Sequence, residues 1–278
     1  MTHRTLLAVD LSYQVYRAAA SHPNLESADG TFTGGLYGFL VTVSKVIRDT
    51  GATHVVVCQD RRPYHRSKLY PEYKMLRKAT QDEDLKRKAD LSMDQVLTAC
   101  EVIGLPVVGI DGFESDDIIG HYVHTHRGRF KDIYAASNDS DLYQLFWCQH
   151  FHVYRKDMDD LMDHAKLLEI TGLDPEQFTL AHALMGTHND VAGIPRVGEK
   201  TSIRAVKDPG VLRTYRERHN DLIERNIRLI KLPYEGFPRS LEMPTMGRFS
   251  HRALYKFAAR YDMTVTASML NAFEQVCT

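Results

Sequence analysis

Five short apolar runs alternate with amphipathic segments along the first 155 residues of the chain. Runs rich in Val, Ile or Leu predict strands at 5–10, 53–59, 105–110, 131–136 and 150–154. Apolar residues spaced three and four apart predict helices at 34–49, 92–103 and 112–126, the second with Ser92 as its N-cap. Strand and helix alternating in this way favour an α/β fold with a mostly parallel central sheet flanked by helices.

The alternation changes in two places. Segment 61–91 is long and highly charged, and a long insertion of this kind inside a compact domain is usually functional or disordered. After about residue 164 the strand pattern fades, and helices are predicted at 164–171, 175–186, 200–207 and 210–230, followed by an irregular connector at 237–249 and a last helical stretch at 251–276. We therefore expect an α/β domain over 1–164 and a helical region over 165–278.

Composition indicates an ordinary globular protein with an uneven charge distribution. No apolar run approaches the ~20 residues that a membrane span needs, and the N-terminus leads into the first strand without a secretory signal. The four cysteines lack CxxC spacing, which argues against a zinc site or a disulfide framework. A monomer in a reducing cytoplasm is expected. The net charge is −1, yet residues 61–88 hold ten Lys and Arg against four Asp and Glu, and residues 191–231 hold ten against five. Two basic stretches fit a polyanionic partner.

Acidic residues follow the ends of the apolar runs. They are Asp10, Asp60, Glu114, Asp116, Asp117, Asp139, Asp141 and Asp190. Because the carboxyl ends of parallel strands meet at one edge of a sheet, we expect these side chains to lie close together. Carboxylates so close cannot all stay ionised unless cations hold them, and oxygen ligands favour Mg²⁺ or Mn²⁺ over zinc. The pattern predicts a pocket for two ions about 4 Å apart.

The segments around these acids form an ordered set of motifs over residues 5–207. They are Ala-Val-Asp10-Leu-Ser, Val-Cys-Gln-Asp60, Arg66-Ser-Lys-Leu-Tyr-Pro-Glu-Tyr73-Lys74-Met-Leu-Arg77, Gly112-Phe-Glu114-Ser-Asp116-Asp117, Ser137-Asn-Asp139-Ser-Asp141 and Gly193-Ile-Pro-Arg196-Val-Gly198-Glu-Lys200. Together they resemble the 5′-nuclease family of flap endonucleases and 5′–3′ exonucleases, which includes the N-terminal domains of bacterial DNA polymerase I and free-standing phage enzymes. We accordingly expect a free-standing enzyme, and a phage origin fits.

The resemblance implies a metal-dependent enzyme that hydrolyses phosphodiesters at 5′ flaps and 5′ ends of DNA, with two Mg²⁺ or Mn²⁺ ions and K⁺ at the hairpin. Segment 61–91 would be a helical arch over the single strand. Lys74 and Arg77, three apart on a helix, would face the scissile phosphate. A helix-hairpin element at about 186–207 would bind the DNA backbone. The implied DNA-binding residues are Arg66, Tyr73, Gly193, Arg196, Gly198, Lys200 and Arg204.

One departure from the family pattern concerns the second metal ion. The family usually has two aspartates before the hairpin, whereas this chain reads Gly186-Thr187-His188-Asn189-Asp190. Either the second site is weaker, or His188 contributes a ligand. Two alternatives to a flap endonuclease stay open: a PIN-type ribonuclease with a similar acidic sheet edge, and a DNA-binding homologue with an impaired second metal site. A haloacid-dehalogenase-like phosphatase would need an aspartate where Ser12 stands.

Overall fold

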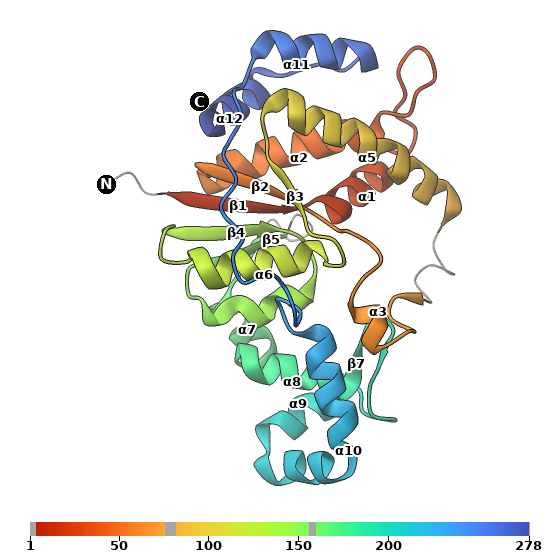
Figure 1. The fold of residues 1–278 in the computed structure, drawn as a ribbon, viewed down its shortest axis with the longest axis vertical. Helices are drawn as coiled ribbons and strands as arrows, with labels where there is room; N and C mark the ends of the chain where they lie inside the picture. Colours follow the sequence, from red (N-terminus) through yellow and green to blue (C-terminus); the bar gives the residue numbers. More distant parts are fainter. Residues whose placement is uncertain (1–3, 76–81, 156–159, 278) are drawn as a thin grey trace.

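The computed structural model describes residues 4–75, 82–155 and 160–277. Its centre is a six-stranded sheet in the order β3-β2-β1-β4-β5-β6 (Figure 1). The strands are β1 (Thr5–Asp10), β2 (His54–Gln59), β3 (Val107–Gly109), β4 (Asp132–Ala136), β5 (Phe151–Arg155) and β6 (Asp160–Met162). The first five pair in parallel and β6 is antiparallel. The predicted parallel sheet is confirmed, and β6 is an edge strand that the apolar pattern did not indicate.

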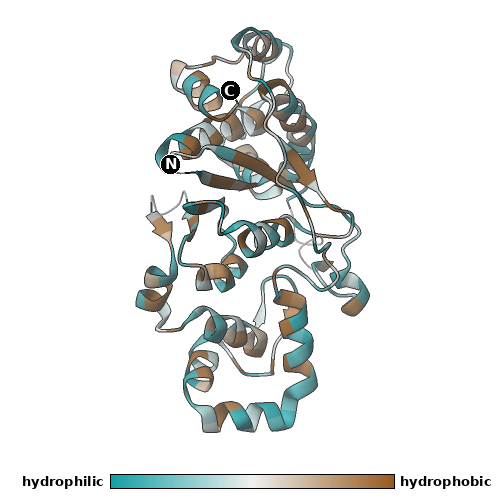
Figure 2. Ribbon diagram, turned by 60° about the vertical axis from the view of Figure 1, so that its left-hand side comes forward, coloured by the Kyte–Doolittle hydropathy of each residue, from teal (hydrophilic) through white to brown (hydrophobic). Residues whose placement is uncertain are grey.

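Helices cover both faces of this sheet, so β1 is buried along its whole length. One face packs against α1 (Leu11–Ser21), α2 (Gly34–Thr50) and α5 (Glu83–Ile103). The other packs against α6 (Ser115–His126), the 3₁₀ helix η1 (Ser140–Trp147), α7 (His164–Thr171) and α8 (Pro175–Met185). Helices α9 (Glu199–Lys207) and α10 (Pro209–Ile230) continue from α8, and α10 bends at His219. Figure 2 shows apolar residues concentrated on the strands.

Two helices in the first half differ from what the sequence pattern predicted. Helix α1 was not predicted; it follows β1 without a linker, and Asp10 caps it by accepting a hydrogen bond from the Tyr13 N–H. Helix α5 begins at Glu83 and not at residue 92, because Asp82 caps it and accepts from the Asp84 and Leu85 N–H groups. Ser92 is therefore a buried residue inside the helix, and its hydroxyl donates to the Lys88 carbonyl.

The predicted arch is described only at its two ends. Its first part holds a short helix, α3 (Arg66–Leu69), followed by a turn in which Lys74 has a φ of 57°. Its last part is the N-terminal portion of α5. Residues 76–81, including Arg77, lie outside the described residues. The arch and the helical pairing of Lys74 with Arg77 stay predictions.

The C-terminal segment returns to the sheet rather than continuing the helical region around α8–α10 (Figure 1). The single stretch predicted at 251–276 is two helices, α11 (His251–Ala258) and α12 (Ala267–Val276), with a 3₁₀ turn, η2 (Ala259–Tyr261), and a left-handed Asp262 after α11. Their apolar residues join the same core as α2 and α5. The domain boundary at residue 164 stays a prediction, and residues 251–277 pack with the first half of the chain.

Candidate metal centre

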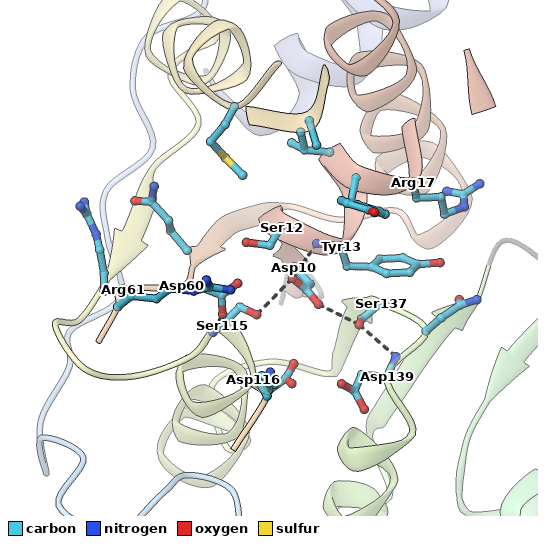
Figure 3. A pocket seen from close by; sticks show the side chains of 18 of the residues that line it. Asp10, Ser12, Tyr13, Arg17, Asp60, Arg61, Ser115, Asp116, Ser137 and Asp139 are labelled. Carbon is cyan, nitrogen blue, oxygen red and sulfur yellow. Dashed lines mark hydrogen bonds between the residues drawn. The ribbon is translucent and has the colours of Figure 1, made fainter. Parts of the chain in front are cut away.

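Four successive parallel strands deliver one aspartate each to the same edge of the sheet. Asp10 ends β1, Asp60 follows β2, Asp116 lies in the first turn of α6 after β3, and Asp139 follows β4. All four line a cavity of about 1100 Å³. Figure 3 shows their side chains turned into this space. The clustering expected from the apolar pattern is what the topology produces.

Two serines hold Asp10 in place. Its carboxylate accepts hydrogen bonds from the Ser115 hydroxyl at 3.1 Å and the Ser137 hydroxyl at 3.0 Å, in addition to the Tyr13 N–H at 3.2 Å. The Ser115 N–H also donates to Asp60 at 2.9 Å. Neither serine was predicted as a site residue, although each stands next to or near an acid in the motifs. Ser115, at the start of α6, thus holds both Asp10 and Asp60, and Ser137, after β4, holds Asp10 from the other side of the strand order.

The electrostatics of these carboxylates fit a bound cation. Burial and the charge of Asp60 raise the pKa of Asp10 to about 7. Burial, with Asp139 and Asp10 nearby, raises the pKa of Asp116 well above its ordinary value. The buried Oδ1 of Asp116 has no hydrogen-bond partner among the described residues. A divalent ion would supply the missing partner and the missing positive charge, and the all-oxygen donor set suits Mg²⁺ or Mn²⁺. We call Asp10, Asp60 and Asp116 the first group.

A second group consists of Asp139, Asp141 and His188, which offer one ligand atom each within 4.8 Å of one another. The hydrogen bond and charge of His188 outweigh burial and hold the pKa of Asp139 below its ordinary value. The other carboxylate of the second group, that of Asp141, accepts a hydrogen bond from the Asn189 Nδ2 at 3.2 Å. The sequence left open whether the second site is weaker or has His188 as a ligand. In the structure, His188 lies close enough to Asp139 and Asp141 to be that ligand.

Asp190, predicted as a metal ligand, does not line the acidic cavity. Residues 188–190 form the turn between β7 (Gly186–Thr187) and β8 (Val191–Ala192), and Asp190 has a φ of 63°. This turn places His188 beside Asp139, while Asp190 lines a separate hollow of about 500 Å³ next to Gly193 and Gly198. In this structure His188, and not Asp190, lies beside Asp139, and the role of Asp190 as a metal ligand stays a prediction.

Two further predicted site residues form a buried ion pair in this structure. Arg66 is 3% exposed and Asp117 is fully buried. The Arg66 guanidinium donates to both Asp117 oxygens at 2.6 and 2.8 Å, and the N–H groups of Glu114 and Tyr234 donate to the same carboxylate. In this structure the two side chains are occupied by each other, and the predicted roles of Arg66 in DNA binding and of Asp117 in metal binding stay predictions. Their pair ties α3 to α6 and to the chain after α10.

Glu114, Tyr73 and Lys74 form a network beside the cavity. Glu114 accepts from Lys74 at one oxygen, and from Arg66 and the Tyr73 hydroxyl at the other. The charges of Lys74 and Arg66 outweigh burial and hold the pKa of Glu114 low. Tyr73 is 6% exposed, so its predicted contact with DNA is not available in this structure. Lys74 is 15% exposed and lines the cavity. Both Glu114 oxygens thus accept hydrogen bonds from neighbouring side chains in this structure, and its role as a metal ligand stays a prediction.

The hairpin residues have different exposures and roles in the fold. Arg196, Lys200 and Arg204 are exposed. Gly198 is the N-cap of α9, whose first N–H groups point outward from the helix end. Gly193 packs so closely that a Cβ there would lie 2.1 Å from the Met185 carbonyl carbon, so this position requires glycine. Their binding to DNA stays a prediction.

The cavity also has basic and aromatic lining that the sequence reasoning missed. Tyr13, Tyr16 and Arg17 come from α1, and Lys86 comes from α5. Arg61 and Arg62 directly follow Asp60 and also line it. The position of the two arginines next to a predicted ligand was a usable signal. The α1 residues carried none, because that helix was not predicted.

More than half of the chain matches the model of one protein family, and the chain belongs to that family. Residues 5–172 match the family model described as "5'-3' exonuclease, N-terminal resolvase-like domain". A 5′-3′ exonuclease of Buchnera aphidicola (Schizaphis graminum strain) is 25% identical over 207 residues, which cover 73% of this chain and 70% of the relative. DNA polymerase I of Mycobacterium tuberculosis is 31% identical over 217 residues, 76% of this chain but 24% of the polymerase. The chain thus spans about a quarter of such polymerases.

Comparison with solved structures shows the same fold over nearly the whole chain. The bacteriophage T5 D15 flap endonuclease, solved in complex with DNA and metal ions, has a TM-score of 0.70 at 18% identity and covers 98% of this chain and 100% of its own. The flap endonuclease-1 of Methanococcus jannaschii has a TM-score of 0.65 at 15% identity, covering 98% and 92%. The C-terminal helices α11 and α12 therefore belong to a fold that is found elsewhere.

Proposed function

Since the chain belongs to the 5′–3′ exonuclease family, we propose that it hydrolyses phosphodiesters at 5′ flaps and 5′ ends of DNA with the help of divalent metal ions. The observation that carries this proposal is the convergence of Asp10, Asp60, Asp116 and Asp139 on one cavity that also holds Lys74. Carboxylates alone would repel a phosphate. Carboxylates that hold cations, with a lysine beside them, can bind one.

The residues proposed to hold the ions fall into the two groups described above. The first group would bind one Mg²⁺ or Mn²⁺, and the second group would bind another beside it. When bound, such ions lower the pKa of a water molecule and stabilise the oxygen that leaves the phosphorus. Ser115 and Ser137 keep Asp10 oriented for this task through their hydrogen bonds.

Lys74 is proposed to contact the scissile phosphate. Its ammonium is paired with Glu114 and lies 5.5 Å from the centre of the Tyr64 ring and 5.4 Å from that of Tyr73. A phosphate in the cavity would compete with Glu114 for this cation, which would free a Glu114 oxygen to face the ions. Charge on Lys74 then balances charge that develops on the phosphate oxygens.

The path of the DNA is proposed from the remaining lining and from the hairpin. Arg61, Arg62 and the aromatic rings of Tyr13 and Tyr16 suit an unpaired strand, since cations follow the phosphates and rings stack on bases. Segment 61–91 would form the arch over that strand. Exposed Arg196, Lys200 and Arg204 would grip the duplex through its phosphates, with K⁺ at the hairpin near Gly193 and Gly198. The enzyme would act as a cytoplasmic monomer.

One experiment tests the proposal directly. The chain is incubated with a 5′-flap DNA, labelled at the 5′ end, with and without MgCl₂. Products cut at or near the base of the flap, formed only with the metal, are expected. Single-stranded RNA of the same sequence serves as the second substrate. Cleavage of the RNA and not of the flap would favour a PIN-type ribonuclease. DNA binding without cleavage, in MgCl₂ and also in MnCl₂, would favour a binding homologue with an impaired centre.

A further inference from the structure

The second group differs from the first in the chemistry of its donor atoms. Asp139 and Asp141 offer carboxylate oxygens, while His188 offers an imidazole nitrogen, its Nε2 lying 3.7 Å from the Asp139 Oδ2. Bonds of about 2.0–2.2 Å to one ion place two ligand atoms at most about 4.4 Å apart. The ligand atoms here lie within 4.8 Å of one another. Small side-chain rotations that move these atoms by about a few tenths of an ångström would therefore bring them onto one ion.

The turn that carries His188 is fixed on both sides. The Lys74 N–H donates to the Asn189 carbonyl at 3.0 Å, and the Asn189 N–H donates to the Thr187 hydroxyl at 3.2 Å. Asn189 is 4% exposed, and its side-chain Nδ2 is directed at Asp141. Its Oδ1 has no hydrogen-bond partner among the described residues. A buried, unpartnered amide oxygen, on a side chain whose amide nitrogen contacts Asp141, is the kind of group that a cation or its bound water satisfies.

Donor type decides which ion such a site prefers. Carboxylate and water oxygens suit Mg²⁺, which demands near-ideal octahedral sites, whereas imidazole is a ligand for first-row transition ions, of which Mn²⁺ binds it most weakly. Replacing one carboxylate by imidazole therefore weakens Mg²⁺ more than a transition ion. It also removes one negative charge from the site, which lowers the purely electrostatic attraction that Mg²⁺ depends on.

We propose that Asp139, Asp141 and His188 form a mixed nitrogen–oxygen site that selects a divalent first-row transition ion, such as Mn²⁺, over Mg²⁺. The inference rests on the proposed function for the role of the ion, but the binding itself does not depend on catalysis. The chain would thus carry two unlike sites, an oxygen-only first group that accepts Mg²⁺ and a second group that prefers Mn²⁺.

The test measures nitrogen coordination without any substrate. The full chain is loaded with Mn²⁺, and pulsed electron paramagnetic resonance detects ¹⁴N coupling from a directly bound imidazole. Wild-type protein should show this coupling. The His188→Gln variant should lose it, and calorimetry should show affinity for the second Mn²⁺ falling by at least about tenfold, since even outer-shell changes cost about 10–100-fold.

Two variants make the result specific to His188. His182, whose Nδ1 lies 3.7 Å from the Asp141 Oδ1, is the nearby competing imidazole. The His182→Gln variant should keep the ¹⁴N coupling. The His188→Asp variant restores a carboxylate, so it should bind two ions without ¹⁴N coupling and should gain Mg²⁺ affinity relative to Mn²⁺ by about tenfold or more.

The possible outcomes separate this inference from the proposed function. Wild-type coupling that is absent, or that persists in His188→Gln, would overturn the mixed site. Coupling lost in His182→Gln instead would assign the nitrogen to the other histidine and overturn it as well. Cleavage of the 5′ flap in MgCl₂ with no ¹⁴N coupling would leave the proposed function standing alone. Coupling without cleavage in either metal would support the site and refute the function.

Discussion

The two groups of metal-binding candidates are held in different ways. The first group stands on the sheet edge, where Ser115 and Ser137 fix Asp10 and the Ser115 N–H fixes Asp60. The second group combines one sheet edge with His188 on the turn of a two-stranded hairpin, far along the chain. The first is organised by the core of the fold, and the second depends on how the hairpin packs. Ligands on the rigid sheet edge keep a constant geometry, whereas a position on a turn can hold a different type of ligand residue without disturbing the core.

The largest effect should come from the first group. Asp10→Asn keeps the cap of α1, because Asn also accepts from an N–H, but it removes a charged ligand. We expect kcat/KM on a 5′ flap to fall on the order of 10³-fold, since a lost ion takes several kcal/mol of transition-state stabilisation with it. Steady-state cleavage and thermal unfolding of the same samples measure this. A loss below tenfold, or a misfolded variant, would contradict the division into groups.

The next effect concerns the support behind the first group. Arg66→Met removes the buried partner of Asp117 and Glu114, which should lower the free energy of unfolding by about 3–5 kcal/mol. Urea unfolding measures this, with Arg62→Ala as the exposed control, expected to change stability by no more than about 0.5 kcal/mol. If Arg66→Met instead weakened DNA binding at unchanged stability, Arg66 would be a DNA contact after all.

Lys74 contacts a chain neighbour of each group: its side chain donates to Glu114, close to Asp116, and its N–H donates to the carbonyl of Asn189, next to His188. Lys74→Ala should reduce kcat by on the order of 10²-fold and change DNA affinity much less, because its phosphate contact strengthens in the transition state. Single-turnover cleavage and equilibrium binding separate the two quantities. Lys68→Ala, an exposed lysine on α3, is the control. Equal losses of turnover and affinity would refute this role.

A smaller effect is expected for the second group. Asp141→Asn should reduce cleavage at low metal concentration by about 10–100-fold, and added Mn²⁺ should restore most of it, because two ligands remain. Asp10→Asn should not be restored in this way. Titrating MnCl₂ against cleavage rate for both variants compares them directly. Equal rescue of both would show that the groups act as a single site.

The smallest expected effect is a change with pH in the number of protons that metal binding releases. In the metal-free chain the folded-state pKa of Asp10 is about 7, above its ordinary 3.8. Its contribution to stability is therefore complete below about pH 3.8 and is lost as pH rises through 7. Metal binding near pH 6 should release a proton from Asp10 that is already gone near pH 9. Calorimetry in buffers of different ionisation enthalpy counts this proton, and Asp10→Asn should abolish the difference.

Local patterns in the sequence predicted the sheet and the acids at its edge. Apolar runs identify buried strands, and parallel pairing then places Asp10, Asp60 and Asp139 together without any knowledge of packing. Helix α1 was missed because it starts directly after the last residue of β1, so that Asp10 is both the strand end and the helix cap. The start of α5 was missed because its first turns are charged and are held by Asp82 and by pairs such as Asp84 with Lys88.

The rest depends on contacts between distant residues. Arg66 and Asp117 are 51 positions apart, and each looked like a functional charge until the fold paired them in the interior. His188, and not Asp190, lies beside Asp139, and this placement depends on a turn in which Asp190 is left-handed. No periodicity in the sequence encodes either fact. Buried charge pairs and turn conformations are where assignment by motif is weakest.

Helices α11 and α12 have a consequence for how the chain is made. Phe257, Phe273 and Val276 belong to the same core as α2 and α5, which are synthesised well before them. The apolar face of α2 and α5 stays uncovered until residues 251–277 have been made, although domains generally begin to fold from the N-terminus during synthesis. A nascent chain stalled before residue 250 would present that face to chaperones and proteases. This core can therefore close during synthesis only after α12 has emerged.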